Sequence, residues 1–174
     1  MLLTDWNNAK ARMLPFEGLA SQIHILDVPK LKLNHVLRTI ACETSDAKVS
    51  VLAGEILDKS IELSIFCKEL DQCSRVADNQ TTINSRMFNE SNVTFDFWGN
   101  MEDDLFELEV WFWADQLFTE NDEKNYNVFC SLASFLKRLT VTGDYQCILT
   151  PNEASDPLKD LESGIGVLID ISSA

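Results

Sequence analysis

Two stretches of strict alternation between residues 93 and 113 constrain this fold more than any other feature of the sequence. Every second position is apolar, and these positions are Val93, Phe95, Phe97, Phe106, Leu108, Val110 and Phe112. Successive side chains on a β-strand point to opposite faces, so the alternation predicts two strands. Gly99-Asn100 follows the first strand and is typical of a hairpin connection. The predicted hairpin has one purely apolar face, which another part of the chain must cover.

The other face of this hairpin mixes aromatic and acidic side chains. Tryptophan is enriched in binding hot spots because it offers a large, rigid contact area, and clustered carboxylates attract cationic partners over long range. The predicted partner-binding residues are those of this face together with the acidic loop between the strands: Asp96, Trp98, Glu102, Asp103, Asp104, Glu107, Glu109, Trp111 and Trp113. The alternative is that a helix, with residues 124–139 as the candidate, covers Trp111 and Trp113.

Periodicity elsewhere predicts two helices and several further strands. Residues 4–13 suit a short helix, and apolar residues recur at helical spacing from Asp122 to about Leu139. Asn121 or Asp122 can act as the N-cap of this second helix. Further strands are predicted over residues 21–28, 48–52, 55–70, 145–149 and 166–172.

Two segments give weaker patterns. Residues 31–42 fit a helix or a strand, and the β-branched Val36, Thr39 and Ile40 favour a strand. Residues 71–90 have few large apolar side chains, which predicts a long polar connection or a poorly buried helix.

Strands therefore dominate, without regular alternation of strands and helices. The predicted fold class is α+β, with a mainly antiparallel sheet and one long helix in the C-terminal half packed on it. A chain of 174 residues can bury one sizeable core, and no linker divides it, so residues 1–174 are predicted to form a single acidic domain.

Charge is distributed unevenly along the chain. Of the 28 acidic and 14 basic residues, residues 1–86 hold 11 and 10, whereas residues 87–174 hold 17 and 4, so the two halves carry −1 and −13. This balance argues against direct binding to nucleic acid or to an anionic membrane surface. A negative second half indicates either a solvated surface or a surface that recognises a cationic partner.

Cofactor, metal and catalytic signatures are weak. The 5 cysteines are scattered, and His24 and His35 lie eleven positions apart, so no zinc or paired-histidine motif is spelled out. Glu107 and Glu109 lie on one strand face, an arrangement that two-carboxylate catalysis could use. A segment with this many carboxylates would contain such a pair by chance, so the pair does not indicate catalysis. We therefore expect neither a cofactor nor a bound metal, and no enzymatic activity.

These observations favour a cytoplasmic, non-enzymatic binding protein. The expected role is that of an inhibitor or immunity-type protein whose acidic second half engages a basic protein, such as a nuclease toxin. The start of the chain lacks a basic segment followed by an apolar run, which favours the cytoplasm. The alternatives are an assembly subunit or homodimer that docks through the tryptophan-bearing face, and an unrecognised enzyme.

Overall fold

The computed structural model describes residues 2–13, 20–53, 55–56, 61–62, 80–87, 91–99, 104–140, 145–150, 156–169 and 171. Its strands are β1 (Ala20–Pro29), β2 (Ser45–Ala53), β3 (Glu55–Ile56), β4 (Ile61–Glu62), β5 (Gln80–Met87), β6 (Ser91–Gly99), β7 (Leu105–Trp113), β8 (Cys147–Thr150) and β9 (Val167–Leu168). Its α-helices are α1 (Leu2–Met13), α2 (Leu33–Glu43), α5 (Ala114–Leu117), α6 (Asp122–Thr140) and α7 (Pro157–Glu162), and a 3-10 turn covers Lys30–Lys32. No helix in the described ranges is both long and apolar enough to span a bilayer.

Within these ranges, nine strands form a single sheet. The order is β3-β2-β5-β6-β7-β1-β8-β9, with β4 also paired to β2. Every pairing between these strands is antiparallel. The predicted α+β class, with a mainly antiparallel sheet and a long C-terminal-half helix packed on it, is confirmed.

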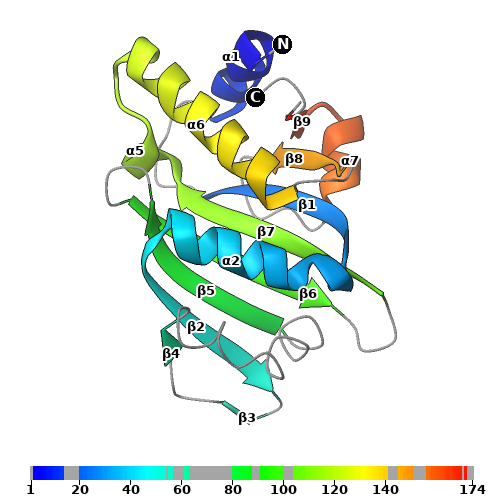
Figure 1. The fold of residues 1–174 in the computed structure, drawn as a ribbon. Helices are drawn as coiled ribbons and strands as arrows, with labels where there is room; N and C mark the ends of the chain where they lie inside the picture. The colour runs from blue at the N-terminus through cyan, green and yellow to red at the C-terminus, as the bar shows by residue number, and fades with distance from the viewer. Residues whose placement is uncertain are drawn as a thin grey trace.

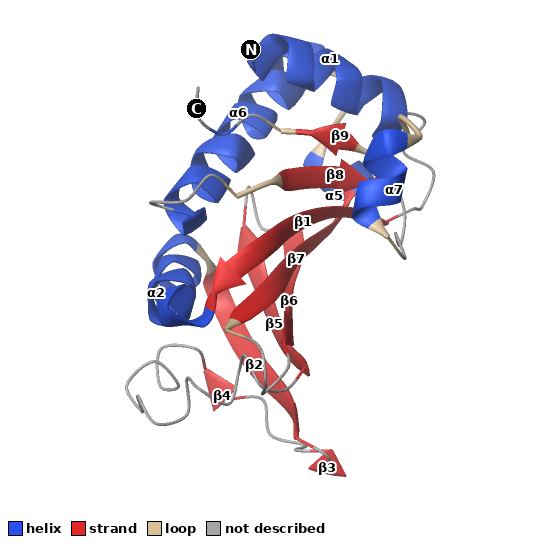
Figure 2. Cartoon of the chain, turned by 90° about the vertical axis from the view of Figure 1, so that its right-hand side faces the viewer, coloured by secondary structure: helices blue, strands red, loops and turns tan. Residues whose placement is uncertain are grey.

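The helices α2 and α6 cover one face of this sheet. Both lie in front of the strands in Figure 1, and the turned view in Figure 2 places them on the same side of the sheet. Phe95 of β6 packs against Phe135 of α6 with ring centroids 5.9 Å apart. In the first half of α6, Phe129 packs against the buried Trp6 of α1 with centroids 5.5 Å apart. The covered face is therefore the apolar one.

The β6–β7 hairpin is the centre of the core, as the alternation predicts. Phe95 pairs with Val110, and Phe97 pairs with Leu108. On the other side of β7, Val110 and Leu108 pair with Ile23 and Ile25 of β1. All of these side chains are buried, so one apolar surface runs without interruption across three strands.

The strand predicted over residues 31–42 is wrong, because the chain forms helix α2 there. Leu33, Val36, Leu37 and Ile40 are all buried, and they follow the i, i+3, i+4, i+7 spacing of a helix stripe. Packing this stripe against the sheet and α6 outweighs the modest strand preference of the β-branched residues.

The polar connection predicted over residues 71–90 is wrong for residues 80–87, which form strand β5 between β2 and β6. Its inward side chains are Thr81, Ile83, Ser85 and Met87. Two of these four are small and polar, which explains the weak apolar signal in the sequence. Backbone hydrogen bonding to strands on both sides supplies the stabilisation that side-chain hydrophobicity does not.

The other predicted elements are placed as follows. The helix at residues 4–13 is part of α1, and the strands at 21–28 and 145–149 correspond to β1 and β8. Within the final strand predicted over residues 166–172, the structure has the two-residue strand β9, Val167–Leu168. Most of the strand predicted over 55–70 lies outside the described residues, which include only β3 and β4 from that range.

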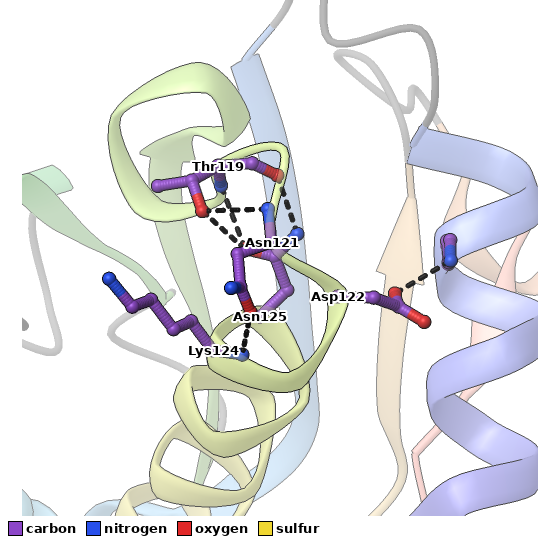
Figure 3. A network of polar contacts seen from close by, with 6 residues as sticks. Thr119, Asn121, Asp122, Lys124 and Asn125 are labelled. Carbon is purple, nitrogen blue, oxygen red and sulfur yellow. Dashed lines mark hydrogen bonds and ion pairs between the residues drawn. The ribbon is translucent and has the colours of Figure 1, made fainter.

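A polar network fixes the start of α6 (Figure 3). The side chain of Asn121 accepts a hydrogen bond from the backbone N–H of Lys124 at 2.9 Å, which makes Asn121 the N-cap. Asn125 exchanges two hydrogen bonds with the backbone of Thr119, each 2.7 Å long. Asp122 forms an ion pair with Lys10 of α1 at 2.6 Å. The prediction that Asn121 or Asp122 caps this helix is confirmed for Asn121.

Replacing this cap should destabilise the fold. We expect N121A to lower the free energy of unfolding by about 1 kcal/mol, because a helix N–H loses its partner. The measurement is urea-induced unfolding followed by circular dichroism. N127A is the matched control, because Asn127 lies on the exposed side of the same helix, where alanine is favoured. Equal stability of N121A and N127A would show that the cap contributes nothing.

Candidate functional site

The second face of the hairpin lies opposite α2 and α6. Asp96 and Trp98 come from β6. The other residues of this face come from β7, and these are Glu107, Glu109, Trp111 and Trp113. Trp98 and Trp113 are 42% and 44% exposed. Since α6 packs on the apolar face, it does not cover Trp98 or Trp113, and Trp111 is half-buried on the second face. Among the predicted loop residues, Asp104 is exposed, whereas Glu102 and Asp103 lie outside the described residues.

A buried histidine joins this face from the neighbouring strand. His24 of β1 pairs with Glu109 of β7 in the sheet register and is buried. Its Nδ1 lies 2.9 Å from Oε1 of Glu107 and 3.5 Å from Oε1 of Glu109. On the opposite side of the ring, Nε2 lies 3.3 Å from the hydroxyl oxygen of Thr150 in β8. Three strands therefore converge on one imidazole.

Glu109 is the most constrained carboxylate of this face. Its Oε2 accepts a hydrogen bond from Trp111 Nε1 at 3.0 Å. Burial raises the pKa of Glu109, while the neighbouring His24 and hydrogen bonds from Trp111 and Trp98 oppose that rise and the charge of Glu107 adds to it. Two of the predicted tryptophans thus bind a predicted carboxylate instead of standing apart from it.

Asp96 occupies a similar position one strand further along. It pairs with Glu109 across the sheet and accepts a hydrogen bond from the hydroxyl group of Thr82 in β5. Burial raises the pKa of Asp96, and the hydrogen bond from Thr82 opposes this rise. The face therefore contains carboxylates that are partly withdrawn from water.

A cleft of about 750 Å³ opens at the end of this face. Its lining residues are Leu26, Asp27, Trp98, Gly99, Asp104, Leu105, Phe106, Glu107 and Leu158. Asp27 lies at an irregularity in the β1–β7 pairing and has a φ of 57°, a left-handed conformation in which aspartate is one of the better tolerated residues. The backbone N–H of Lys30 donates to the carbonyl of Asp104 at 2.8 Å and holds that residue beside the end of β1.

Sequence reasoning located the tryptophans and carboxylates of this site but missed His24, Asp27 and Leu158. Alternation in β1 does place His24 on the face opposite Ile23 and Ile25. What the sequence does not contain is the register that sets β1 against β7, which brings together residues 83 positions apart. The contribution of Leu158 depends on where α7 packs, and α7 lies beside β8 (Figure 2).

Chemically, this arrangement suits a cation. One buried imidazole and two glutamates meet at a single point, and the adjoining cleft has further carboxylates. In comparisons with protein-family models, curated proteins and solved structures, no match to this chain was found.

The raised pKa of Asp96 predicts a pH-dependent effect on stability. Because the folded state holds the Asp96 proton more tightly than the unfolded chain does, this carboxyl destabilises the fold increasingly as pH rises from its ordinary pKa of 3.8 through the raised value. We therefore expect D96N to gain stability relative to the wild type at pH 7, and the gain to shrink as the pH falls toward 4. Asparagine keeps an oxygen that can accept the hydrogen bond from Thr82.

Urea unfolding of both proteins at several values between pH 4 and pH 7 measures this difference. D115N is the control, because Asp115 is exposed on α5. A D96N difference that stayed constant with pH, or grew on acidification, would contradict the expected effect of burial on Asp96.

Proposed function

We propose that this chain is a non-catalytic binding protein that engages a basic protein partner through its acidic sheet face and the adjoining cleft. The role is that of an inhibitor or immunity-type protein, with a nuclease toxin as one kind of target. The observation that carries this proposal is the lining of the cleft. Its charged lining residues, within the described part of the chain, are the three carboxylates of Asp27, Asp104 and Glu107, and the exposed Trp98 stands beside them.

A lysine or arginine side chain suits such a cleft. The ring of Trp98 can attract a cationic head group through its π-face, which contributes about 0.5–1 kcal/mol at exposed sites. The carboxylates supply ionic partners, and the apolar side chains of Leu105 and Leu158 can contact the methylene stem of the cation. Each part of the cleft therefore matches a part of a basic side chain.

The overall charge supports the same partner. Net charge is −14, and 13 of these negative charges belong to residues 87–174, which include the whole β6–β7 hairpin. A negative surface of this kind speeds the encounter with a basic protein, and the effect weakens as salt screens it. An acidic inhibitor of a nuclease gains in this way because the substrate cleft of its target is basic.

The test compares two variants that lose the same charge. D27N/D104N removes two carboxylates from the cleft, and D115N/E120Q removes two exposed carboxylates elsewhere. With a fluorescent arginine-rich decapeptide as the probe, we expect D27N/D104N to bind about threefold to tenfold more weakly than the wild type, which corresponds to two solvent-exposed ion pairs. D115N/E120Q should show a smaller loss, and fluorescence anisotropy measures both.

Equal losses in the two variants would mean that the peptide responds only to net charge, and the cleft would not be a recognition site. The same pair of variants can then be used to capture partners from a pool of basic proteins. Retention of a partner by D115N/E120Q and its loss by D27N/D104N supports the proposal. A captured partner whose association rate is indifferent to salt contradicts it.

A second candidate function is supported by the exposure of Trp113. This tryptophan lies at the other end of β7 from the cleft and is 44% exposed, as an assembly surface requires. If the chain is a homodimer docked through this face, light scattering should show a dimer that W113A converts to a monomer. A wild-type monomer at high concentration excludes the homodimer.

A further inference from the structure

We propose that His24, Glu107 and Glu109 form a binding site for a divalent transition-metal ion. Their candidate ligand atoms all lie within 4.8 Å of one another. The separations of 2.9 and 3.5 Å from His24 Nδ1 to the two Oε1 atoms match the spacing of ligands around one ion. Metal bonds of about 2.1 Å place neighbouring ligands about 3.0 Å apart in octahedral and about 3.4 Å apart in tetrahedral geometry.

The chemistry of the three ligands indicates the class of ion. Imidazole nitrogen favours zinc and other first-row transition metals, whereas sites for Mg²⁺ and Ca²⁺ use oxygen ligands. One nitrogen with two carboxylate oxygens is therefore better suited to Zn²⁺ than to Mg²⁺. This cluster also differs from an ordinary acidic patch, because a fully buried histidine forms its centre.

Contacts behind the ligands hold them in orientations suited to binding. Thr150 Oγ1 lies 3.3 Å from His24 Nε2, so the ring can keep its proton on Nε2 and present Nδ1 to the ion. Trp111 donates to Oε2 of Glu109 and leaves Oε1 facing the histidine. Such supporting hydrogen bonds are characteristic of metal sites, in which they fix the ligand and tune its basicity.

The site is also accessible. The side chain of Glu107 is 32% exposed and forms part of the cleft lining, whereas that of His24 is 1% exposed. An ion can therefore enter from the cleft and meet a buried nitrogen on the inner side. Three protein ligands leave at least one coordination position for water or for a group of a bound partner.

Binding replaces the hydrogen bond between His24 Nδ1 and Glu107 with two metal bonds. When Nδ1 binds the ion, it gives up the proton of that hydrogen bond to solvent, and the ring proton then lies on Nε2 beside Thr150. The step needs no oxidant or co-reactant.

The experiment is a titration of chelator-treated, reduced protein with Zn²⁺ by isothermal calorimetry at pH 7. We expect one Zn²⁺ per chain, bound at least about tenfold more tightly than Mg²⁺. E107Q and H24Q should each weaken Zn²⁺ binding by at least about tenfold. The matched controls are H35Q, which changes the other histidine, and E123Q, which changes an exposed glutamate on α6; both should bind as the wild type does.

Two further variants keep the result interpretable. If H24Q fails to fold by circular dichroism, E107Q, which changes a partly exposed residue, still tests the site. C42S/C130S should retain Zn²⁺ binding, because the exposed Cys42 and the half-buried Cys130 lie outside the proposed ligand set. D27N/D104N should retain it too, so that failure of the metal site and failure of the partner-binding cleft are distinguishable.

Three results would overturn the metal site. The first is the absence of saturable binding of one Zn²⁺ per chain. The second is equal affinity for Zn²⁺ and Mg²⁺, which is the behaviour of a diffuse acidic surface. The third is a loss in H35Q, E123Q or C42S/C130S as large as the loss in E107Q.

Discussion

The pairing of β1 with β7 is the interaction on which both the core and the candidate site depend. It sets Ile23 against Val110 on the apolar face and His24 against Glu109 on the second face. Because side chains alternate along a strand, a slip of one residue would turn Ile23 out of the core and put the imidazole into it. The hydrophobic effect on one face thus specifies the geometry on the other. Burial of Ile23 and Ile25 already determines this register, so the contact between His24 and Glu109 is not needed to maintain it.

The two faces of the sheet are stabilised in different ways. On the covered face, aromatic and aliphatic side chains pack against α2 and α6, and each large buried side chain contributes about 1.5–3 kcal/mol. On the second face, burial raises the pKa of Asp96 and of Glu109, so the ionised forms of these carboxyl groups are destabilised there. Hydrogen bonds from Thr82 and Trp111 offset part of that destabilisation. A face that retains partly buried carboxylates is tolerated because the opposite face supplies the stability, and that pattern is typical of a functional surface.

The sequence predicts the elements whose local pattern and tertiary environment agree. The β6–β7 hairpin and α6 were predictable because their apolar residues repeat with the period of the structure that buries them. Helix α2 was not, since its stripe from Leu33 to Ile40 includes β-branched residues, and only contact with the sheet decides between the two patterns. Strand β5 has Thr81 and Ser85 on its inner side, so its identity depends on pairing with neighbours. The tryptophans and carboxylates of the site could be found because alternation is a local pattern. His24 could not, because it joins the site only through the register of β1 against β7.

Glu107 belongs both to the lining of the cleft and to the proposed metal site. A divalent ion on Glu107 would reduce the negative charge that the cleft presents, and would therefore weaken its attraction for a cationic side chain. This effect is reciprocal: the metal lowers the affinity for the partner, and the bound partner lowers the affinity for the metal by the same factor. Asp27 and Asp104 would still face the cleft when the metal is bound, so the coupling falls short of exclusion. With both sites in place, the concentration of metal affects how strongly this face binds a basic protein. His24 belongs to this metal site because the β1–β7 pairing that forms the core also sets His24 against Glu109.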